Sequence, residues 1–322
     1  GTVAVHSDVD SESMHVRLAD ESVCIGSHQP QNSYLNISSL MSAVDLTGAE
    51  AIHPGYGFLS ENAKFAEVVT KHGIKFIGPS SKLISEMGDK IQAKKIAKKN
   101  GLPVIEGSEG GVKSFEEAKS LCKEIGYPIL IKAAAGGGGI GMQIVEESSE
   151  FENALKLCQS RARSAFGDER VFVEKYIQGA QHIEFQVLGD GKKAIHFGER
   201  FCSIQRRHQK LVEEGPWLSD EKREEIGALV CKGAESVGYK GLATFEFLRD
   251  ANGDFYFLEV NPRVQVEHTV TELITGHNLV ELGIRVAQGE PLPLEQKDIV
   301  LRGHAIQCRL NAEDPRNFIP SP

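Results

Sequence analysis

The stretch FLEVNPRVQVEH, residues 257–268, alternates between apolar and polar side chains over ten successive positions. Its polar positions are Glu259, Asn261, Arg263, Gln265 and Glu267, and the positions between them hold Leu258, Val260, Pro262, Val264 and Val266. Successive side chains of a pleated strand point to opposite faces of the sheet. The pattern therefore predicts a strand with an apolar face that anchors it and a polar face that carries two carboxylates, two amides and a guanidinium.

The run before it, GLATFEFLRDANGDFYFLEV (241–260), is typical of a β-hairpin. A two-residue turn at Asn252 and Gly253 would place Glu246 directly opposite Glu259. Facing carboxylates repel each other unless a proton or a cation lies between them. Asn261 adds an amide oxygen on the same face, and oxygen ligands suit Mg²⁺ or Mn²⁺. The hairpin is a candidate metal site; a solvated hairpin or a slipped register is the alternative interpretation.

Composition limits the class of protein. The 322 residues are 40% hydrophobic and 25% charged, which is ordinary for a globular chain with sizeable cores. The net charge of −9 argues against nucleic acid and anionic membranes as partners, and no apolar run reaches the roughly 20 residues of a membrane span. Six scattered cysteines indicate a reducing compartment, so we expect a cytoplasmic protein, or a mitochondrial matrix protein if the source is eukaryotic.

The first ninety residues alternate short strands with helices, which is the pattern of a parallel α/β layer. The strands are expected at 3–5, 21–25, 51–53 and 76–77, and the helices at 38–46 and 62–73. The motif HPGYGFLSEN (53–62) would lie at the carboxyl edge of this layer, where such sheets bind ligands.

A small α/β unit is expected over about 91–180, with strands at 128–133, 142–145 and 171–176. Capping boxes, Ser114 with Glu117 and Ser149 with Glu152, would begin its two helices. From about 181 the pattern becomes antiparallel β, with a helix at 219–238 and another from 267 or 269 to 287. The predicted fold class is therefore α/β combined with α+β.

Two further motifs point to an anionic ligand. Gly136, Gly137, Gly138 and Gly139 link two strands and leave backbone N–H groups free to approach phosphate, with Lys132 ending the strand before them. The run QRRHQK (205–210) is strongly basic. A flexible hairpin tip and a solvated basic face are the alternatives. With the metal pair, these parts describe an ATP site that transfers a phosphoryl group by positioning and charge neutralisation.

The same residues resemble a known family. Lys90, Lys132, the glycine flap, VEKYI (173–177), Glu246 and the ExNxR pattern of Glu259–Arg263 resemble the ATP-grasp superfamily. The motifs HPGYGFLSEN, MGDK, QRRHQK, EVNPRVQVEH and CRLNAEDP are similar to those of the biotin carboxylase family, from one end of the chain to the other. The resemblance implies an ATP-grasp fold with a Rossmann-like N-terminal domain (1–88, incomplete), an ATP-grasp domain (89–290, lid about 105–180) and the start of a C-terminal domain (291–322). In that family the chain extends beyond both ends, so we expect a fragment.

The resemblance implies ATP- and bicarbonate-dependent carboxylation of biotin on a carrier protein, through carboxyphosphate. It also assigns site residues by class. The metal ligands, for two ions of Mg²⁺ or Mn²⁺, would be Glu246, Glu259 and Asn261. The ATP contacts would add Lys90, Lys132, the four flap glycines, Glu174, Lys175, Ile177, His182, Gln205, His208 and Leu248. The bicarbonate pocket would be Lys210, Arg263, Gln265, Val266 and Glu267.

Within this set the resemblance makes Glu267 the general base that deprotonates bicarbonate and Arg309 the cation that stabilises the biotin enolate, with Lys210 and Arg263 also catalytic. Implied partners are a biotin carboxyl carrier protein or domain and a carboxyltransferase, in a homodimer or larger complex. The final carboxyl acceptor stays open among acetyl-CoA, propionyl-CoA, methylcrotonyl-CoA, pyruvate and urea. Ile140 stands where the family often has Arg or Lys, and we expect this to tune nucleotide affinity.

Two alternatives remain at this point. One is another ATP-grasp ligase with an acyl-phosphate intermediate, such as a carbamoyl phosphate synthetase half. The other is a non-catalytic nucleotide-binding scaffold. The motifs QRRHQK and RVQVEH count against the first, and the complete set of candidate ligands together with Glu267 and Arg309 counts against the second.

Overall fold

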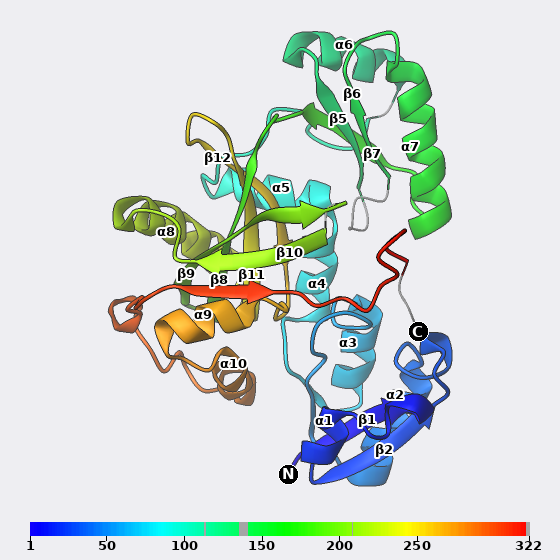
Figure 1. Ribbon diagram of the computed structural model, residues 1–322, viewed down its shortest axis with the longest axis vertical. Coiled ribbons are helices and arrows are strands. Elements are labelled where there is room, and N and C mark those ends of the chain that lie inside the picture. The colour runs from blue at the N-terminus through cyan, green and yellow to red at the C-terminus, as the bar shows by residue number, and fades with distance from the viewer. Residues whose placement is uncertain (113, 135–140, 208, 320–322) are drawn as a thin grey trace.

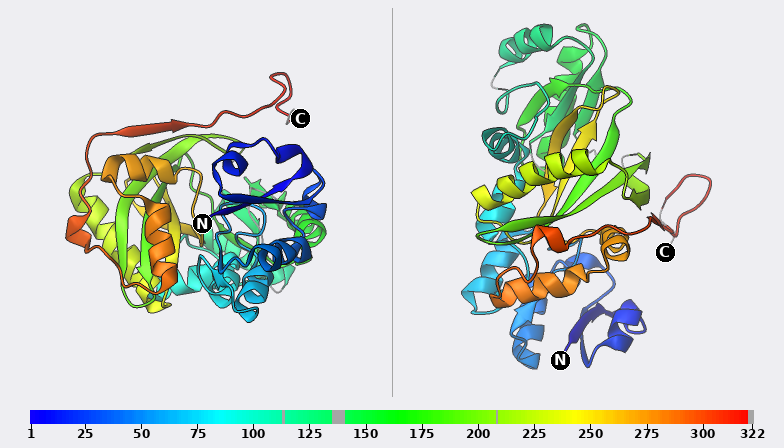
Figure 2. Two further views of the ribbon diagram at one scale, coloured as in Figure 1. Left: turned by 90° about the horizontal axis from the view of Figure 1, so that it is seen from below. Right: turned by 90° about the vertical axis from the view of Figure 1, so that its left-hand side faces the viewer.

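A central antiparallel sheet lies between two smaller units in the computed structural model, which describes residues 1–112, 114–134, 141–207 and 209–319. The N-terminal α/β unit lies at one end of the molecule and a small three-stranded unit at the other, with the large sheet between them (Figure 1). The segment that follows the last strand runs out beyond this sheet (Figure 2). None of the described helices is long and apolar enough to cross a membrane.

The N-terminal unit confirms the predicted strand–helix alternation, as two separate parallel pairs. Strand β1 (Val3–Ser7) pairs with β2 (Glu21–Gly26), and β3 (Ala51–Ile52) pairs with β4 (Lys75–Phe76). The helices are α1 (Met14–Leu18), α2 (Ile37–Thr47), α3 (Ala63–Lys71) and α4 (Ser81–Gly88), with 3-10 turns at Asp8–Asp10 and Pro30–Asn32. The side chains of Asn36 and Asn62 cap α2 and α3 by accepting backbone N–H bonds.

In the small unit, β5 (Ile129–Ala133) lies between β6 (Met142–Val145) and β7 (Val171–Lys175), all antiparallel. Helices α6 (Phe115–Ile125) and α7 (Phe151–Phe166) cover it. Ser114 caps α6 as predicted. The predicted capping box at Ser149 is wrong: α7 begins after Glu150, whose carboxylate accepts the N–H of Glu146 instead.

The central sheet has the strand order β12-β11-β8-β9-β10-β13. Its strands are β8 (Gln181–Asp190), β9 (Ala194–Arg206), β10 (Gln209–Gly215), β11 (Lys240–Arg249), β12 (Phe255–Asn261) and β13 (Ala305–Cys308). Apolar side chains on one face pack against α4, α5 (Lys90–Lys99) and α8 (Asp220–Ser236). On the other face, Leu188 and Leu242 pack against α10 (Leu279–Gln288) at one end of the strands. Further along that face lie buried polar residues, among them Glu184, Gln186, Thr244 and Glu246.

The β11–β12 hairpin pairs Glu246 with Glu259 as predicted, by a different route. The expected two-residue turn is wrong, because Arg249 pairs with Phe255 and a five-residue loop separates them. The carboxylate of Asp250 shapes that loop by accepting the N–H groups of Asn252 and Asp254. The expected turn would have paired Arg249 with Tyr256, so the observed pairing is offset by one residue. A bulge at Leu258 adds one residue on β12 and restores the expected register at Glu259.

The predicted strand over 257–267 ends at Asn261, where Pro262 lacks the N–H needed to continue the ladder. Residues 262–267 therefore form an irregular segment, and the bulge turns Leu258 towards the cavity described below, not towards the apolar face. The single helix expected after this segment is two helices, α9 (His268–Thr275) and α10, because Gly276 adopts a left-handed φ of 73° and ends α9. A 3-10 turn, Gln296–Asp298, precedes β13.

Candidate active site

A cavity of about 1060 Å³ opens where the N-terminal unit, the small unit and the central sheet meet. Most of the site residues predicted from the sequence line it, although they come from distant segments. Those residues are Lys90, Lys132, Ile177, His182, Gln205, Lys210, Glu246, Leu248, Glu259, Asn261, Arg263, Gln265, Val266, Glu267 and Arg309. Tyr56 of the HPGYGFLSEN motif and Glu313 of the last segment also line it.

Other predicted residues lie elsewhere. Glu174 is buried behind the cavity wall, where it forms an ion pair with Lys132 and lies 3.7 Å from the amino group of Lys94. Lys175 donates its amino hydrogens to the backbone carbonyls of Gly126 and Tyr127, at 2.9 and 3.2 Å. The flap residues Gly136, Gly137, Gly138, Gly139 and Ile140, and His208, lie outside the described residues.

Three carboxylates stand in a row across three neighbouring strands. Glu184 on β8 pairs with Glu246 on β11, and Glu246 pairs with Glu259 on β12. Glu184 is completely buried and Glu246 is nearly so. Glu184 was not among the predicted site residues. Its place in the row depends on the pairing of β8, which begins with the HIEFQ run, with β11. Rules for hairpins do not predict this long-range pairing.

Cations from other elements neutralise this row. The amino group of Lys210 contacts Glu184 and lies 2.8 Å from both Glu246 Oε1 and Glu267 Oε1. Burial lowers the pKa of Lys210, but Glu184 and Glu246 outweigh it and hold that pKa well above its ordinary value. Lys90, the first residue of α5, forms an ion pair with Glu259. The facing carboxylates of Glu246 and Glu259 were predicted to need a nearby proton or cation. Among the described residues, Lys210 and Lys90 supply this charge.

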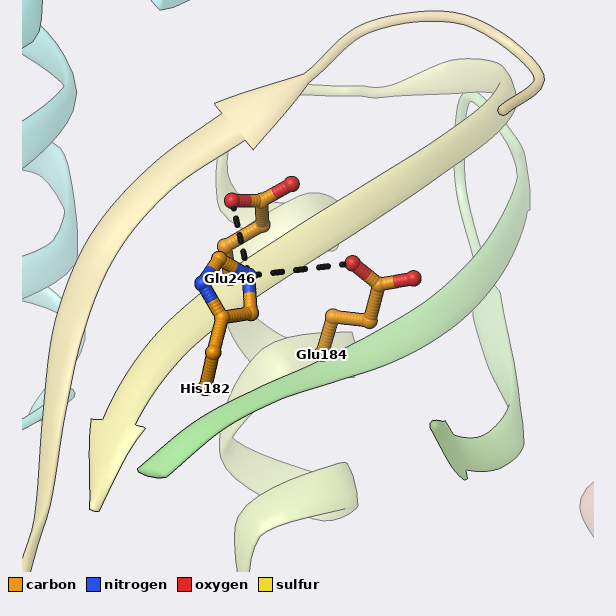
Figure 3. Close-up of side chains that lie close together, drawn as sticks. All are labelled: His182, Glu184 and Glu246. Carbon is orange, nitrogen blue, oxygen red and sulfur yellow. Dashed lines mark ion pairs between the residues drawn. The ribbon is translucent and has the colours of Figure 1, made fainter. Parts of the chain in front are cut away.

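His182 lies at the centre of the row. Its Nε2 lies 3.0 Å from Glu246 Oε2 and 3.9 Å from Glu184 Oε2, and Figure 3 shows the ring between the two carboxylates. Burial lowers the pKa of His182, but the negative charge of Glu246 raises it by more, so the net shift of that pKa is upward. Burial likewise raises the pKa of Glu246, but Lys210 and His182 hold it well below its usual range.

Glu267 is held between two cations. Its Oε1 accepts from Lys210, and its Oε2 accepts from Arg309 Nη2 at 2.8 Å. Arg309 also donates from Nε to Glu213 Oε1 at 2.5 Å, and Glu213 is completely buried on β10. Glu213 was not among the predicted residues. The segment 262–267 brings Glu267 to this position as an irregular loop, not as the strand face that the alternation predicted.

We expect stability to depend on pH through Glu267. Burial raises its pKa, but Lys210 and Arg200 lower it more, to about 2 from 4.5. Because the folded pKa lies below the unfolded one, the stabilisation is complete above about pH 5 and is lost as the pH falls from 4.5 towards 2. It amounts to about 3 kcal/mol.

Urea unfolding at pH 6 and at pH 3 measures this effect. Glu267→Gln should be markedly less stable than the unsubstituted chain at pH 6, and the gap should narrow at pH 3. Glu67→Gln, which removes an exposed pair with Lys71, is the control and should show little difference at either pH. An equal gap at both pH values would contradict the assigned charge of Glu267.

Arg263 lies at the junction of the N-terminal unit and the sheet. Its Nε is 3.0 Å from Glu61 Oε2, and its Nη2 donates to Asn261 Oδ1 at 3.1 Å. Asn261 in turn donates to Glu246 Oε1 at 2.8 Å, and Gln265 donates to the same oxygen at 3.0 Å. The cavity therefore has an acidic side, Glu246 and Glu259, next to a cluster of N–H donors that suits a small anion.

The acidic side has the chemistry of a magnesium site. Glu246, Glu259 and Asn261 offer carboxylate and amide oxygens at the cavity wall, which are the ligands Mg²⁺ prefers. His182, Glu184 and Glu246 also bring one ligand atom each within 4.8 Å of one another. These residues fit a divalent cation bound together with phosphate oxygens.

Two family models match successive parts of the chain. Residues 1–84 match the model described as biotin carboxylase, N-terminal domain. Residues 89–295 match the model described as carbamoyl-phosphate synthase L chain, ATP binding domain. The first match ends within α4, and the second begins at the residue before α5.

Known proteins resemble the chain over its whole length. The biotin carboxylase of Pseudomonas aeruginosa is 50% identical over 325 aligned residues, which cover 100% of this chain and 72% of that protein. A crystal structure of the Campylobacter jejuni biotin carboxylase in complex with β,γ-ATP superposes with a TM-score of 0.95 at 49% identity, covering 99% of this chain and 72% of that one. The biotin carboxylase domain dimer of the 2-oxoglutarate carboxylase of Hydrogenobacter thermophilus, in complex with MgADP, ADP and bicarbonate, gives 0.94 at 49% identity, covering 99% and 71%.

These matches confirm the predicted fold class, since solved ATP-grasp structures superpose on nearly all of the chain. The cavity, with its acidic side next to a cluster of N–H donors, agrees with the nucleotide, magnesium and bicarbonate bound in these relatives. The chain belongs to the biotin carboxylase family of ATP-dependent ligases.

Proposed function

We propose that this chain carboxylates biotin on a carrier protein or domain, using ATP and bicarbonate, through carboxyphosphate. The observation that carries this proposal is the arrangement around Lys210, which contacts Glu246 on the acidic side and Glu267 on the other side. A phosphate site and a bicarbonate site would then share one wall. The relative from Hydrogenobacter thermophilus, bound to MgADP and bicarbonate, supports the same pair of ligands.

ATP would enter between the small unit and the sheet. Ile177 and Leu248 line that side of the cavity and would contact the adenine, with Gln205 and His182 towards the ribose or phosphates. Lys90 and Lys132 lie at the same wall and would meet the phosphates, together with the flap glycines and His208. Glu174 and Lys175 would shape the adenine side from behind it, where Glu174 fixes the amino group of Lys132.

Magnesium would be held by Glu246, Glu259 and Asn261, and we propose two ions or their manganese equivalents. Bound there, the metal supplies positive charge to the phosphate oxygens as the terminal phosphoryl group is transferred. Lys90 supports that position from the first turn of α5, since its amino group already pairs with Glu259.

Bicarbonate would bind beside Arg263, Gln265 and the backbone of Val266. A guanidinium grips a planar oxyanion with parallel N–H bonds, and Arg263 lines the cavity beside the amide of Gln265. Glu267 would then take the bicarbonate proton. Its pKa of about 2 means that it is ionised at neutral pH and ready to accept that proton, although it is a weak base in this state.

Biotin would approach Arg309, whose guanidinium is oriented by Glu213 and Glu267. A fixed cation there stabilises negative charge that develops on the ureido oxygen. We propose a carrier protein or domain and a carboxyltransferase as partners, a homodimer or larger complex as the assembly, and a cytoplasmic or mitochondrial matrix location. The domain division at 88/89 and 290/291, with a lid over about 105–180, belongs to the same proposal.

Bicarbonate-dependent ATP hydrolysis tests the function. The chain should release phosphate from ATP only with bicarbonate and Mg²⁺ or Mn²⁺, and free biotin should stimulate the release. Excess EDTA should stop turnover, and added Mg²⁺ should restore it. ATP hydrolysis that is indifferent to bicarbonate would overturn the proposal, and hydrolysis that requires ammonia would favour a carbamoyl phosphate synthetase-like ligase.

A further inference from the structure

One arginine behind the cavity, Arg200 on β9, has every N–H of its guanidinium bonded within the protein. The side chain is completely buried. Its Nε donates to Glu184 Oε1 at 2.6 Å, and Nη1 donates to Gln186 Oε1 and Thr271 Oγ1, both at 2.8 Å. Its Nη2 donates to Thr244 Oγ1 and Gln265 Oε1, both at 3.2 Å. Because a guanidinium has five N–H donors, these five bonds use all of them.

The five acceptors come from four different elements. Glu184 and Gln186 lie on β8, Thr244 on β11, Thr271 on α9 and Gln265 in the irregular segment before α9. That segment has no strand neighbour to hold it, since the ladder ends at Asn261. A planar group with donors at fixed angles can connect such elements in only one arrangement.

Two of these bonds fix the orientation of side chains that line the cavity. Arg200 occupies the oxygen of Gln265, so the amide nitrogen of Gln265 must face Glu246, where it donates at 3.0 Å. Arg200 also occupies Oε1 of Glu184, which leaves Oε2 to hold the amino group of Lys210. Gln265 and Lys210 line the cavity, while Arg200 itself lies behind them.

We propose that Arg200 is a positioning residue for the bicarbonate site: it fixes the amide orientation of Gln265 directly and the amino group of Lys210 through Glu184. This inference rests on the proposed function, because it names the residue that organises the proposed bicarbonate pocket. Arg200 does not line the cavity, so it acts only through the side chains that it holds.

The charges around Glu184 also favour a positioning role for Arg200. Glu184 is completely buried between Arg200 and Lys210. Without Arg200, Lys210 would be the cation nearest to Glu184 among the described residues, closer than His182 Nε2 at 3.9 Å, and it would be drawn away from Glu246 and Glu267, which it now contacts at 2.8 Å. The amide of Gln265 would also be free to turn. Both changes weaken the site for a small anion.

The chain contains a matched control for this arginine. Glu199, the neighbour of Arg200 on β9, pairs with Arg223 of α8, whose Nε donates at 2.6 Å and Nη2 at 3.1 Å. Arg223 is also buried and also bonded to a buried carboxylate. It lies on the α8 side of the sheet and does not line the cavity. Arg223→Met therefore removes a comparable buried ion pair without touching the site.

The experiment compares Arg200→Met, Arg200→Lys and Arg223→Met in bicarbonate-dependent ATP hydrolysis, with thermal unfolding measured in parallel. Arg200→Met should raise the KM for bicarbonate about tenfold or more, because the charged hydrogen bonds that orient the side chains of Gln265 and Lys210 are lost. The KM for ATP should change less than about threefold. Arg200→Lys should recover part of the loss, since it keeps the charge but not the fork. Arg223→Met should lower Tm by a similar amount and leave the bicarbonate KM unchanged.

An unchanged bicarbonate KM in Arg200→Met, or equal KM increases in Arg200→Met and Arg223→Met, would overturn the inference. If Arg200→Met does not fold, Thr271→Val decides: it removes one bond to the guanidinium with little change of volume, and the bicarbonate KM should rise about twofold or more. An unchanged KM in that variant would count against the inference. Failure of the proposed function is distinguishable, because the unsubstituted chain would then show no bicarbonate dependence at all.

Discussion

Replacing Glu267 with glutamine should lower turnover by about two to four orders of magnitude and leave ATP binding within about twofold. Glutamine has nearly the same size but cannot accept the proton of bicarbonate. Glu267 accepts from Lys210 and Arg309 and is not among the residues proposed to meet the adenine and phosphates. Steady-state phosphate release gives the turnover, and calorimetric titration with ATP and Mg²⁺ gives the binding.

Glu214→Gln is the control for that variant. Glu214 lies on β10 next to Glu213, but its carboxylate pairs with His304 at 2.9 Å and does not line the cavity. Its turnover should stay within about twofold, as expected for a partly exposed ion pair. Loss of ATP binding in Glu267→Gln would show that the role assigned to Glu267 is wrong.

Replacing Lys210 with methionine should have the largest effect on stability, a loss of about 3–5 kcal/mol in the free energy of unfolding. The substitution leaves Glu184, Glu246 and Glu267 without the cation that they share, and all three are buried. Turnover should also disappear, because the same amino group lies between the proposed phosphate and bicarbonate sites. Urea unfolding at pH 7 measures the stability.

Lys71→Met provides the comparison. Lys71 pairs with Glu67 at 2.6 Å, but both side chains are more than half exposed, so the change should stay within about 0.5 kcal/mol. The loss caused by Lys210→Met should become smaller at lower pH, where protonation relieves the unpaired carboxylates. A loss below about 1 kcal/mol at pH 7 would contradict the role of Lys210 as the cation that these three carboxylates depend on.

Much of the fold could be predicted because its signals are local. The capping residue Ser114, the glycine at 126 that ends α6, and the apolar runs of β5, β6 and β7 each depend on a few neighbouring residues. Errors arose where one local signal competed with another. Ser149 matched a capping box, yet α7 begins after Glu150; Pro262 ended a strand that the alternation alone would have continued to Glu267.

The hairpin shows how a correct conclusion can rest on a wrong detail. The five-residue loop leaves the strands one residue out of the register that a two-residue turn would give, and a bulge at Leu258 removes this offset before Glu259. Neither feature is visible in the alternation pattern, because the loop is stabilised by Asp250 and the bulge depends on the strands beside it. The pairing of Glu246 with Glu259 holds only because both occur together.

By itself, the sequence determined the family, most of the order of the elements and most of the residues proposed for the site, since these follow from residue types at short spacings. Tertiary structure alone decided that Glu184 joins Glu246 and Glu259 in one row, that Lys210 reaches three carboxylates, and that Arg200 and Glu213 hold the groups around them. The physical reason is that ion pairs and buried hydrogen bonds depend on distances between atoms far apart in the chain. Those distances exist only once β8, β9, β10 and β11 have paired and α9 has closed over them.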